Sequence, residues 1–188
     1  GCTCEQGAKS PGGCCRGKAD REGIVLMRPS VAVAIPTYRR NAEVLSAVRS
    51  AAIAAEGVCD ITIGVFDNDP SSVVEEVLQK EWGTVSRYFG TTKNRGYLWN
   101  WRRCIEWAEE ERGEFRLLLE DDNRLEPDFF AATLAVLTRG PQLDYAFTSS
   151  TEFDDTGAEE VWTPSSRRGV EAFSGEVGRK DMLCWCFY

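Results

Sequence analysis

Short apolar runs alternate with amphipathic stretches through the middle of the chain. The runs are too short for buried helices and predict strands, while the stretches between them carry apolar residues at helical spacing. The expected strands are 31–36, 60–66, 85–89, 115–119 and 145–150, and the expected helices are 41–55, 71–80, 97–111 and 127–137. This alternation predicts an α/β fold, with a mostly parallel sheet and helices on both of its faces.

Local signals support the expected helices. Asn41 is a suitable N-cap, two serines open the second helix, and Pro127 falls in the first turn of the last one. Trp107 lies on the third helix, where a large apolar residue is predicted to be in the core. Arg102 and Arg103 are predicted to lie on the exposed face of the same helix.

The regular pattern covers residues 27–157 and changes on both sides. Residues 1–26 are rich in Cys and Gly and are predicted to be a disordered extension. Their cysteines follow C-x-C-x9-C-C, which is not a usual zinc spacing, so reduced thiols are favoured over a metal site. Residues 158–188 are polar and turn-rich before they end on MLCWCFY, which suggests an incomplete region. Cys184 and Cys186 share one face of that run and are predicted to be buried thiols.

The composition narrows the possible functions. The formal net charge of the 188 residues is -8, which argues against general nucleic-acid binding, because that needs a basic face. The chain has no histidine, which removes histidine-dependent nucleophiles and histidine-ligated metals. It also has no run of about 18 apolar residues. We therefore expect a soluble, cytoplasmic protein with at most peripheral contact at the inner membrane surface.

Polar residues follow each of the first four expected strands, at 36–40, 67–69, 93–96 and 120–122. Because the carboxyl ends of parallel strands share one edge of the sheet, these sets are predicted to meet there. Clustered carboxylates beside Arg and Lys suit an anionic ligand bridged by Mg²⁺ or Mn²⁺, which take oxygen ligands. The alternative for residues 120–122 is a solvated acidic turn, since Asp and Glu favour the start of a helix.

Two common phosphate-binding motifs are missing from the sequence. It contains no G-x-x-x-x-G-K-[ST], and no G-x-G-x-x-G follows the first strand. That strand leads instead into Pro36, Thr37 and Tyr38, which offer no glycine amides to phosphates. Nucleotide contacts would therefore come from side chains and a metal.

Four stretches together resemble the family 2 glycosyltransferases of GT-A fold. They are VAVAIPTYRR, ITIGVFDNDPSS, KNRGYLWNWRRCIEWAEEERGEFRLLLEDDNRLEPDFF and LDYAFTSSTEFDDTG, in the order and at the spacings of that family. The resemblance covers residues 31–157 and implies a GT-A, Rossmann-like fold. It makes residues 27–157 a nucleotide-sugar-binding core and residues 158–188 the start of an incomplete acceptor-side region.

The predicted nucleotide-sugar site joins the polar sets to the motifs of that family. It comprises Pro36, Thr37, Tyr38, Arg40, Asp67, Asn94, Arg95, Gly96, Glu120 and Asp121, with Asp122 as the ligand of Mn²⁺ or Mg²⁺. The resemblance implies that residues 36–38 line the base pocket, that Asp67 bonds the base or ribose, and that residues 94–96 shape a loop over the nucleotide. It places Glu120 and Asp121 near the ribose and metal, although Glu120 replaces the commoner aspartate and reaches further. Arg40 is included because it follows the first strand.

The resemblance implies a metal-dependent enzyme that moves a sugar from a nucleotide-diphosphate sugar to a hydroxyl of a glycan or lipid-linked acceptor. The family usually places its catalytic base beyond these motifs. The carboxylates left there are Asp154, Asp155, Glu159, Glu160, Glu171, Glu176 and Asp181, none in a convincing context, so the base stays unassigned. Trp162, in an expected loop, is a candidate acceptor contact.

Two other functions stay open. The chain could be a nucleotide-sugar-binding module without transfer activity, because the acceptor half and the base are incomplete. It could also be a nucleotidyltransferase on a related sheet, although such an enzyme normally has a glycine-rich, basic loop after its first strand, where this chain has PTYRR.

Overall fold

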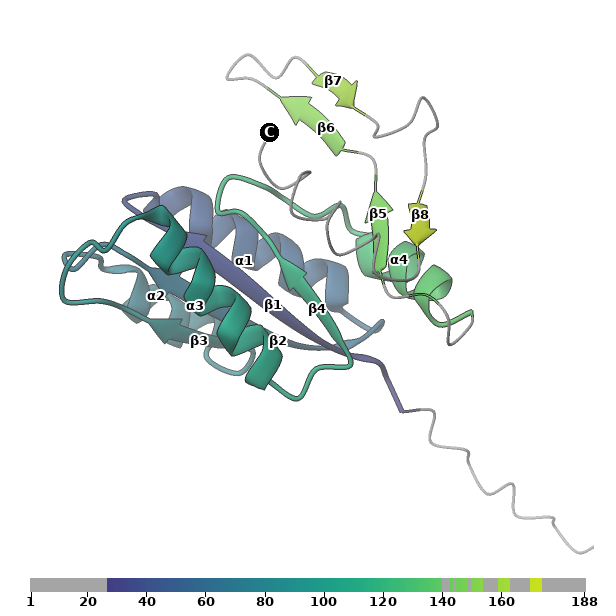
Figure 1. The fold of residues 1–188 in the computed structure, drawn as a ribbon, viewed down its shortest axis with the longest axis horizontal. Coiled ribbons are helices and arrows are strands. Elements are labelled where there is room, and N and C mark those ends of the chain that lie inside the picture. Colours follow the sequence, from purple (N-terminus) through teal and green to yellow (C-terminus); the bar gives the residue numbers. More distant parts are fainter. Residues whose placement is uncertain are drawn as a thin grey trace, which may run out of the picture.

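The computed structural model describes residues 27–139, 143, 145–148, 150–153, 159–162 and 170–173. Its elements are β1 (Ser30–Thr37), α1 (Asn41–Ala55), β2 (Asp60–Asp67), α2 (Val74–Trp82), β3 (Ser86–Phe89), α3 (Tyr97–Glu110), β4 (Phe115–Leu118), α4 (Phe129–Leu137), β5 (Tyr145–Thr148), β6 (Ser150–Phe153), β7 (Glu159–Trp162) and β8 (Val170–Phe173). Figure 1 shows β1 to β4 as one twisted layer, with α3 in front of it and α1 and α2 behind.

The four strands β1 to β4 form a parallel sheet in the order β3-β2-β1-β4. β1 pairs with β2 along its whole length, from Ser30 opposite Asp60 to Thr37 opposite Asp67, and with β4 on its other side. It takes this central place because residues 31–35 are apolar on both faces and at most 3 % exposed. The predicted α/β class, a parallel sheet with helices on both faces, is confirmed.

The two-residue period of β1 divides its side chains between two cores. Val33 and Ile35 pack in a large cluster with residues of α1, α2 and α4, whereas Ala34 packs with Cys104 and Ala108 of α3. The larger side chains therefore face three helices, and the small alanine allows α3 to lie close to the sheet.

A cluster of aromatic rings fills the α3 side of the sheet. Phe66 stacks on Phe89 with ring centroids 4.6 Å apart, and it meets Trp107 edge-on at 5.7 Å. Gly64 makes room for these rings, because a Cβ there would lie 2.9 Å from the Phe66 ring and 3.0 Å from that of Trp107. Trp107 packs against this core, as predicted, and is partly buried.

The two adjacent arginines of α3 differ from each other. Arg102 is exposed, as predicted, with 77 % of its side chain accessible. The prediction is wrong for Arg103, which is half-buried. Its guanidinium lies 4.7 Å from the ring centroid of Trp99 and 5.3 Å from that of Phe66. The long side chain reaches back over the aromatic cluster instead of extending into solvent.

The first two helices begin differently from the prediction. α1 covers the predicted range, but Asn41 is its first helical residue rather than its cap, because Arg40 takes the N-cap position. α2 begins at Val74 instead of Ser71. Ser71 donates both its N–H and its hydroxyl to Asp69 Oδ1, at 3.0 and 2.7 Å, and this local turn delays the helix.

The last predicted helix and strand also need correction. Phe129 N–H donates to Glu126 O at 3.0 Å, which places Pro127 inside a turn before α4 and not in its first helical turn. β5 covers four of the predicted residues but leaves the parallel sheet and pairs antiparallel with β8, while β6 pairs antiparallel with β7. α4 precedes β5 and contacts α1, β5 and β8, and within the described residues β5 does not pair with β4.

Some predictions concern residues that the structure does not describe. Outside the described ranges lie residues 1–26, Cys184, Cys186, Asp154, Asp155, Glu176 and Asp181. Glu159 and Glu160 belong to β7, and Glu171 belongs to β8. Trp162 ends β7, so it lies in a strand and not in the predicted loop.

Candidate functional site

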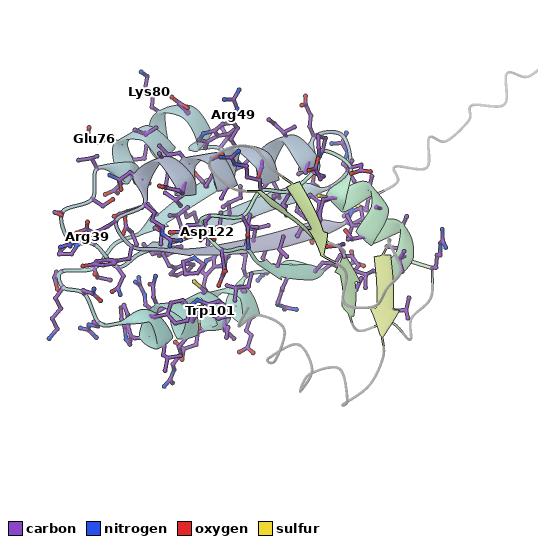
Figure 2. The ribbon with its side chains drawn as sticks, turned by 90° about the horizontal axis from the view of Figure 1, so that it is seen from above. Arg39, Arg49, Glu76, Lys80, Trp101 and Asp122 are labelled. Carbon is purple, nitrogen blue, oxygen red and sulfur yellow. The ribbon has the colours of Figure 1, made fainter. Side chains whose placement is uncertain are left out.

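A cavity of about 460 Å³ opens at the carboxyl edge of the sheet. Its lining residues come from all four predicted polar sets and from α3: Pro36, Thr37, Tyr38, Arg40, Asn68, Asn94, Gly96, Tyr97, Asn100, Trp101, Glu120, Asp121 and Asp122. In Figure 2, Asp122 and Trp101 mark two walls of this cavity, and Arg39 lies further out at the tip of the molecule. The volume is within the range of small-molecule sites, roughly 300–1,000 Å³.

Two predicted site residues do not line the cavity. Asp67 is 1 % exposed, and its carboxylate accepts the N–H of Asp69 at 2.9 Å and the hydroxyl of Tyr88 at 3.3 Å. Arg95 lies with its guanidinium 4.8 Å from the ring centroid of Trp99. Asp67 therefore holds the end of β2 in shape, and Arg95 packs against Trp99 of α3.

Asp121 and Asp122 share one guanidinium. Arg40 Nη1 donates to Asp121 Oδ1 at 3.0 Å and to Asp122 Oδ2 at 2.5 Å. The other oxygen of Asp121 accepts the hydroxyl of Thr37 at 2.7 Å. Burial raises the pKa of Asp121, and the contacts with Thr37 and Arg40 act against that rise. The pKa of Arg40 is raised by its hydrogen bond to Asp122 and by the charge of Asp121.

The two aspartates differ in accessibility. Only 9 % of the Asp121 side chain is accessible, whereas 49 % of the Asp122 side chain is. Asp121 is fixed from two sides, and Asp122 stands at the open side of the cavity. Asp122 is thus the more accessible of the two carboxylates.

Glu120 has a third environment. Its Oε1 accepts the hydroxyl of Tyr97, the first residue of α3, at 3.2 Å. Burial raises the pKa of Glu120, the negative charges of Asp122 and Asp121 add to the rise, and the hydrogen bond from Tyr97 opposes it. Glu120 therefore ties the loop after β4 to the start of α3 across the cavity.

Side-chain amides build another wall. Asn68 Nδ2 donates to Asn94 Oδ1 at 2.8 Å and to Gly96 O at 3.2 Å, and Asn68 Oδ1 accepts the N–H of Arg95 at 3.0 Å. Asn94 Oδ1 also accepts the N–H of Gly96 at 2.7 Å. Gly96 has φ 88° and ψ 163°, a conformation that is essentially restricted to glycine. These bonds fix the predicted loop 94–96 against the end of β2.

Asn100 is a cavity residue that the sequence prediction missed. It is 3 % exposed, and its Nδ2 donates to Phe66 O at 2.7 Å and to Thr37 O at 3.4 Å, so it joins the ends of β1 and β2. The signal was present in the sequence, because Asn100 precedes Cys104 and Ala108 at helical spacing on the buried face of α3. A polar residue at a core position of that kind predicts a specific partner.

The turn between β1 and α1 positions the arginine that lies between the carboxylates. Arg39 has φ 59°, a left-handed conformation that costs a non-glycine residue about 1–2 kcal/mol. Its Nε lies 3.9 Å from Asp69 Oδ2, and its guanidinium lies 5.0 Å from the ring centroid of Tyr38. This turn directs Arg40 toward Asp121, while Arg39 points outward (Figure 2).

The donor set suits a divalent cation that is shared with a ligand. The described part of the chain contains no group of three Asp, Glu or Cys side chains arranged around a metal position. Asp121 and Asp122 nevertheless converge on a single positive group, Arg40 Nη1. One or two carboxylates completed by phosphate oxygens and water are a common environment for Mg²⁺. Mn²⁺ or Mg²⁺ therefore fits here if substrate phosphates supply further ligands.

Comparison with known proteins gives little sequence similarity. No family model matches the chain, and no curated protein matches it. Among solved structures, residues 1–349 of TarS from S. aureus match with a TM-score of 0.47 and 16 % identity. The match covers 57 % of this chain and 32 % of that structure. A likeness at this level does not bear on activity, so function is inferred from the residues of the cavity.

None of the helices in the described residues is long and apolar enough to cross a membrane.

Proposed function

We propose that this chain is a glycosyltransferase of family 2 type, which binds a nucleotide-diphosphate sugar together with Mn²⁺ or Mg²⁺ at the carboxyl edge of the sheet. It would transfer the sugar to a hydroxyl of a glycan or lipid-linked acceptor. The observation that carries the proposal is the aspartate pair around one cationic group, beside a cavity large enough for a nucleotide. This combination supports a diphosphate ligand with its counter-ion.

Each wall of the cavity has a proposed role. Tyr38 and Tyr97 are 38 % and 51 % exposed and offer aromatic surface to a base or sugar. Asn94 is exposed in the same wall and offers its amide group for polar contacts with the ribose or base, while the buried Asn68 holds it in place. Arg40 offers positive charge to the diphosphate.

Asp122 is the proposed metal ligand, with Asp121 behind it. When bound, the divalent cation would stabilise the negative charge that develops on the leaving diphosphate. Thr37 keeps Asp121 in place through its 2.7 Å hydrogen bond, so the inner carboxylate is oriented before any ligand arrives. No catalytic base is assigned.

A thermal-shift panel tests the proposal. UDP, GDP, dTDP and CDP would each be added with and without Mn²⁺, at about 100 times their dissociation constants, where binding should raise the melting temperature by roughly 5–10 °C. Asp122→Asn should remove the metal-dependent part of the shift. Glu126→Gln, which removes one charge from an exposed residue of the same loop, should keep it. No shift with any nucleotide in a cooperatively melting protein would contradict the proposal.

A binding module without transfer activity is the second candidate. It is favoured by the contacts of the three cavity carboxylates, since Glu120, Asp121 and Asp122 each already accept a hydrogen bond from a neighbouring side chain. The sugar nucleotide selected by the panel would be incubated with candidate acceptors or with water alone. Release of free nucleoside diphosphate would exclude the module, and binding without release would support it.

A further inference from the structure

Arg40 occupies the position that a ligand cation would need. One nitrogen, Nη1, contacts both Asp121 and Asp122, at 3.0 and 2.5 Å. The ion pairs join residues 81 and 82 positions apart in the chain, so they are tertiary contacts and not part of a local turn. Half of the Arg40 side chain is accessible, and the residue lines the cavity. The protein itself therefore supplies one positive charge to the two carboxylates.

We propose that Arg40 is an exchangeable counter-ion, which holds Asp121 and Asp122 in the free protein and moves to the diphosphate when ligand and divalent cation bind together. The inference rests on the proposed function, because it takes that ligand to be a nucleoside diphosphate. It adds a coupling between the two ligands that the resemblance to glycosyltransferases does not supply.

The contacts of Arg40 allow such a change of partner. Its backbone is fixed at the start of α1, where Arg40 O accepts the N–H of Val44 at 3.0 Å. Among the described residues, Arg39, Arg95 and Arg103 lie over aromatic rings, whereas no such ring contact involves the Arg40 guanidinium. A long side chain with a fixed base and an accessible head can swing without disturbing the fold.

The carboxylates would stay in place during the exchange. Asp121 keeps the hydroxyl of Thr37 as a partner when Arg40 leaves. Asp122 becomes more accessible on its cavity side. A divalent cation and the Arg40 guanidinium are both positive and repel each other, so they exclude each other from the position between the aspartates.

The exchange predicts effects of opposite sign on the two ligands. Without nucleotide, a divalent cation must displace Arg40 with no phosphate to receive it, so Arg40 weakens binding of the cation alone. With a diphosphate present, Arg40 gains a new partner, so it strengthens nucleotide binding. The cation and the nucleotide should therefore bind cooperatively. If Arg40 had only a structural role, its removal would weaken the binding of the cation and of the nucleotide alike.

The experiment compares Arg40→Gln with the wild type and with Arg49→Gln. Arg49 is exposed on α1, the helix that Arg40 caps, and lies on the opposite side of the sheet from Trp101 (Figure 2), so its variant removes the same charge away from the cavity. Mn²⁺ binding is measured by electron paramagnetic resonance without nucleotide. Binding of the nucleoside diphosphate is measured by calorimetry with and without Mn²⁺.

Arg40→Gln should bind Mn²⁺ alone about tenfold more tightly than the other two proteins, within the usual 5–150-fold range of coupling between sites. Its nucleotide affinity in the presence of Mn²⁺ should fall, and the cooperativity should disappear. Equal or weaker Mn²⁺ binding than in Arg49→Gln would overturn the exchange. A failure of the proposed function is distinguishable, because then the wild type itself binds no nucleotide with Mn²⁺.

A measurement on the unaltered protein guards against an effect of the substitution on folding. The side-chain ¹⁵N signals of Arg40 would be followed by NMR during titration with Mg²⁺, which is diamagnetic, and then with nucleotide. Signals that move on addition of both ligands, with the arginines of α3 unchanged, support the exchange. An Arg40 signal that stays constant at saturation contradicts it.

Discussion

Substitution of Gly96 by alanine tests how tightly the amide wall of the cavity is constrained. A Cβ at this position meets no atom within 4 Å, so the effect is conformational and not steric. Keeping φ 88° and ψ 163° with a side chain costs about 1–3 kcal/mol. If the backbone relaxes instead, the bonds to Asn94 and Asn68 are lost, at about 0.5–1.5 kcal/mol each. Either route predicts a loss of about 1–3 kcal/mol.

The assay is equilibrium urea denaturation followed by tryptophan fluorescence. Gly57→Ala is the matched control, because Gly57 has φ 72° and also has no atom within 4 Å of an added Cβ, but lies after α1. It should lose about 1–2 kcal/mol and keep the nucleotide-induced thermal shift, whereas Gly96→Ala should reduce that shift. A Gly96→Ala protein as stable as the wild type, beside a destabilised Gly57→Ala protein, would refute the constraint on the loop.

Three further results are expected. Burial raises the pKa of Asp121 above the ordinary value of 3.8, so this residue stabilises the fold most below pH 3.8, and that stability is lost as the pH rises through the raised pKa. The urea midpoint of Asp121→Asn should therefore increase with pH relative to that of the wild type. Parallel pH curves for the two proteins would contradict this. Asn100→Asp sets a buried carboxylate against Phe66 O and should cost about 3–5 kcal/mol in the free energy of unfolding, unlike Asn123→Asp on the surface. Gly64→Ala should lower that free energy by about 1–3 kcal/mol through overpacking, and an unchanged near-ultraviolet circular dichroism spectrum of the rings would argue otherwise.

The sequence by itself determined the sheet and the edge at which the site lies. Apolar runs bounded by turn residues identified β1 to β4, and the spacing of apolar residues gave α1 the observed limits. Once the strands are parallel, the residues that follow them must share an edge, so the four polar sets met as predicted. These inferences succeed because strand and helix periods are local properties of the chain.

Tertiary structure alone decided how the side chains of that edge are used. Asp67 ends β2 and Asp121 lies just after β4, yet Asp67 turns inward to Asp69 and Tyr88 while Asp121 turns to the cavity. Such choices depend on which partners other strands and helices bring within hydrogen-bond distance, and spacing along the chain does not encode this.

The roles of Arg40 and Asn100 could not be predicted from the sequence for the same reason. Arg40 meets Asp121 across 81 residues, and Asn100 joins two strand ends that lie 34 and 63 residues away. Sequence periodicity places each residue on an element, but only the packed sheet and α3 fix the distances between elements. The charge pattern therefore predicted that a cation belongs beside the aspartates, and the fold decided that the protein supplies one of its own.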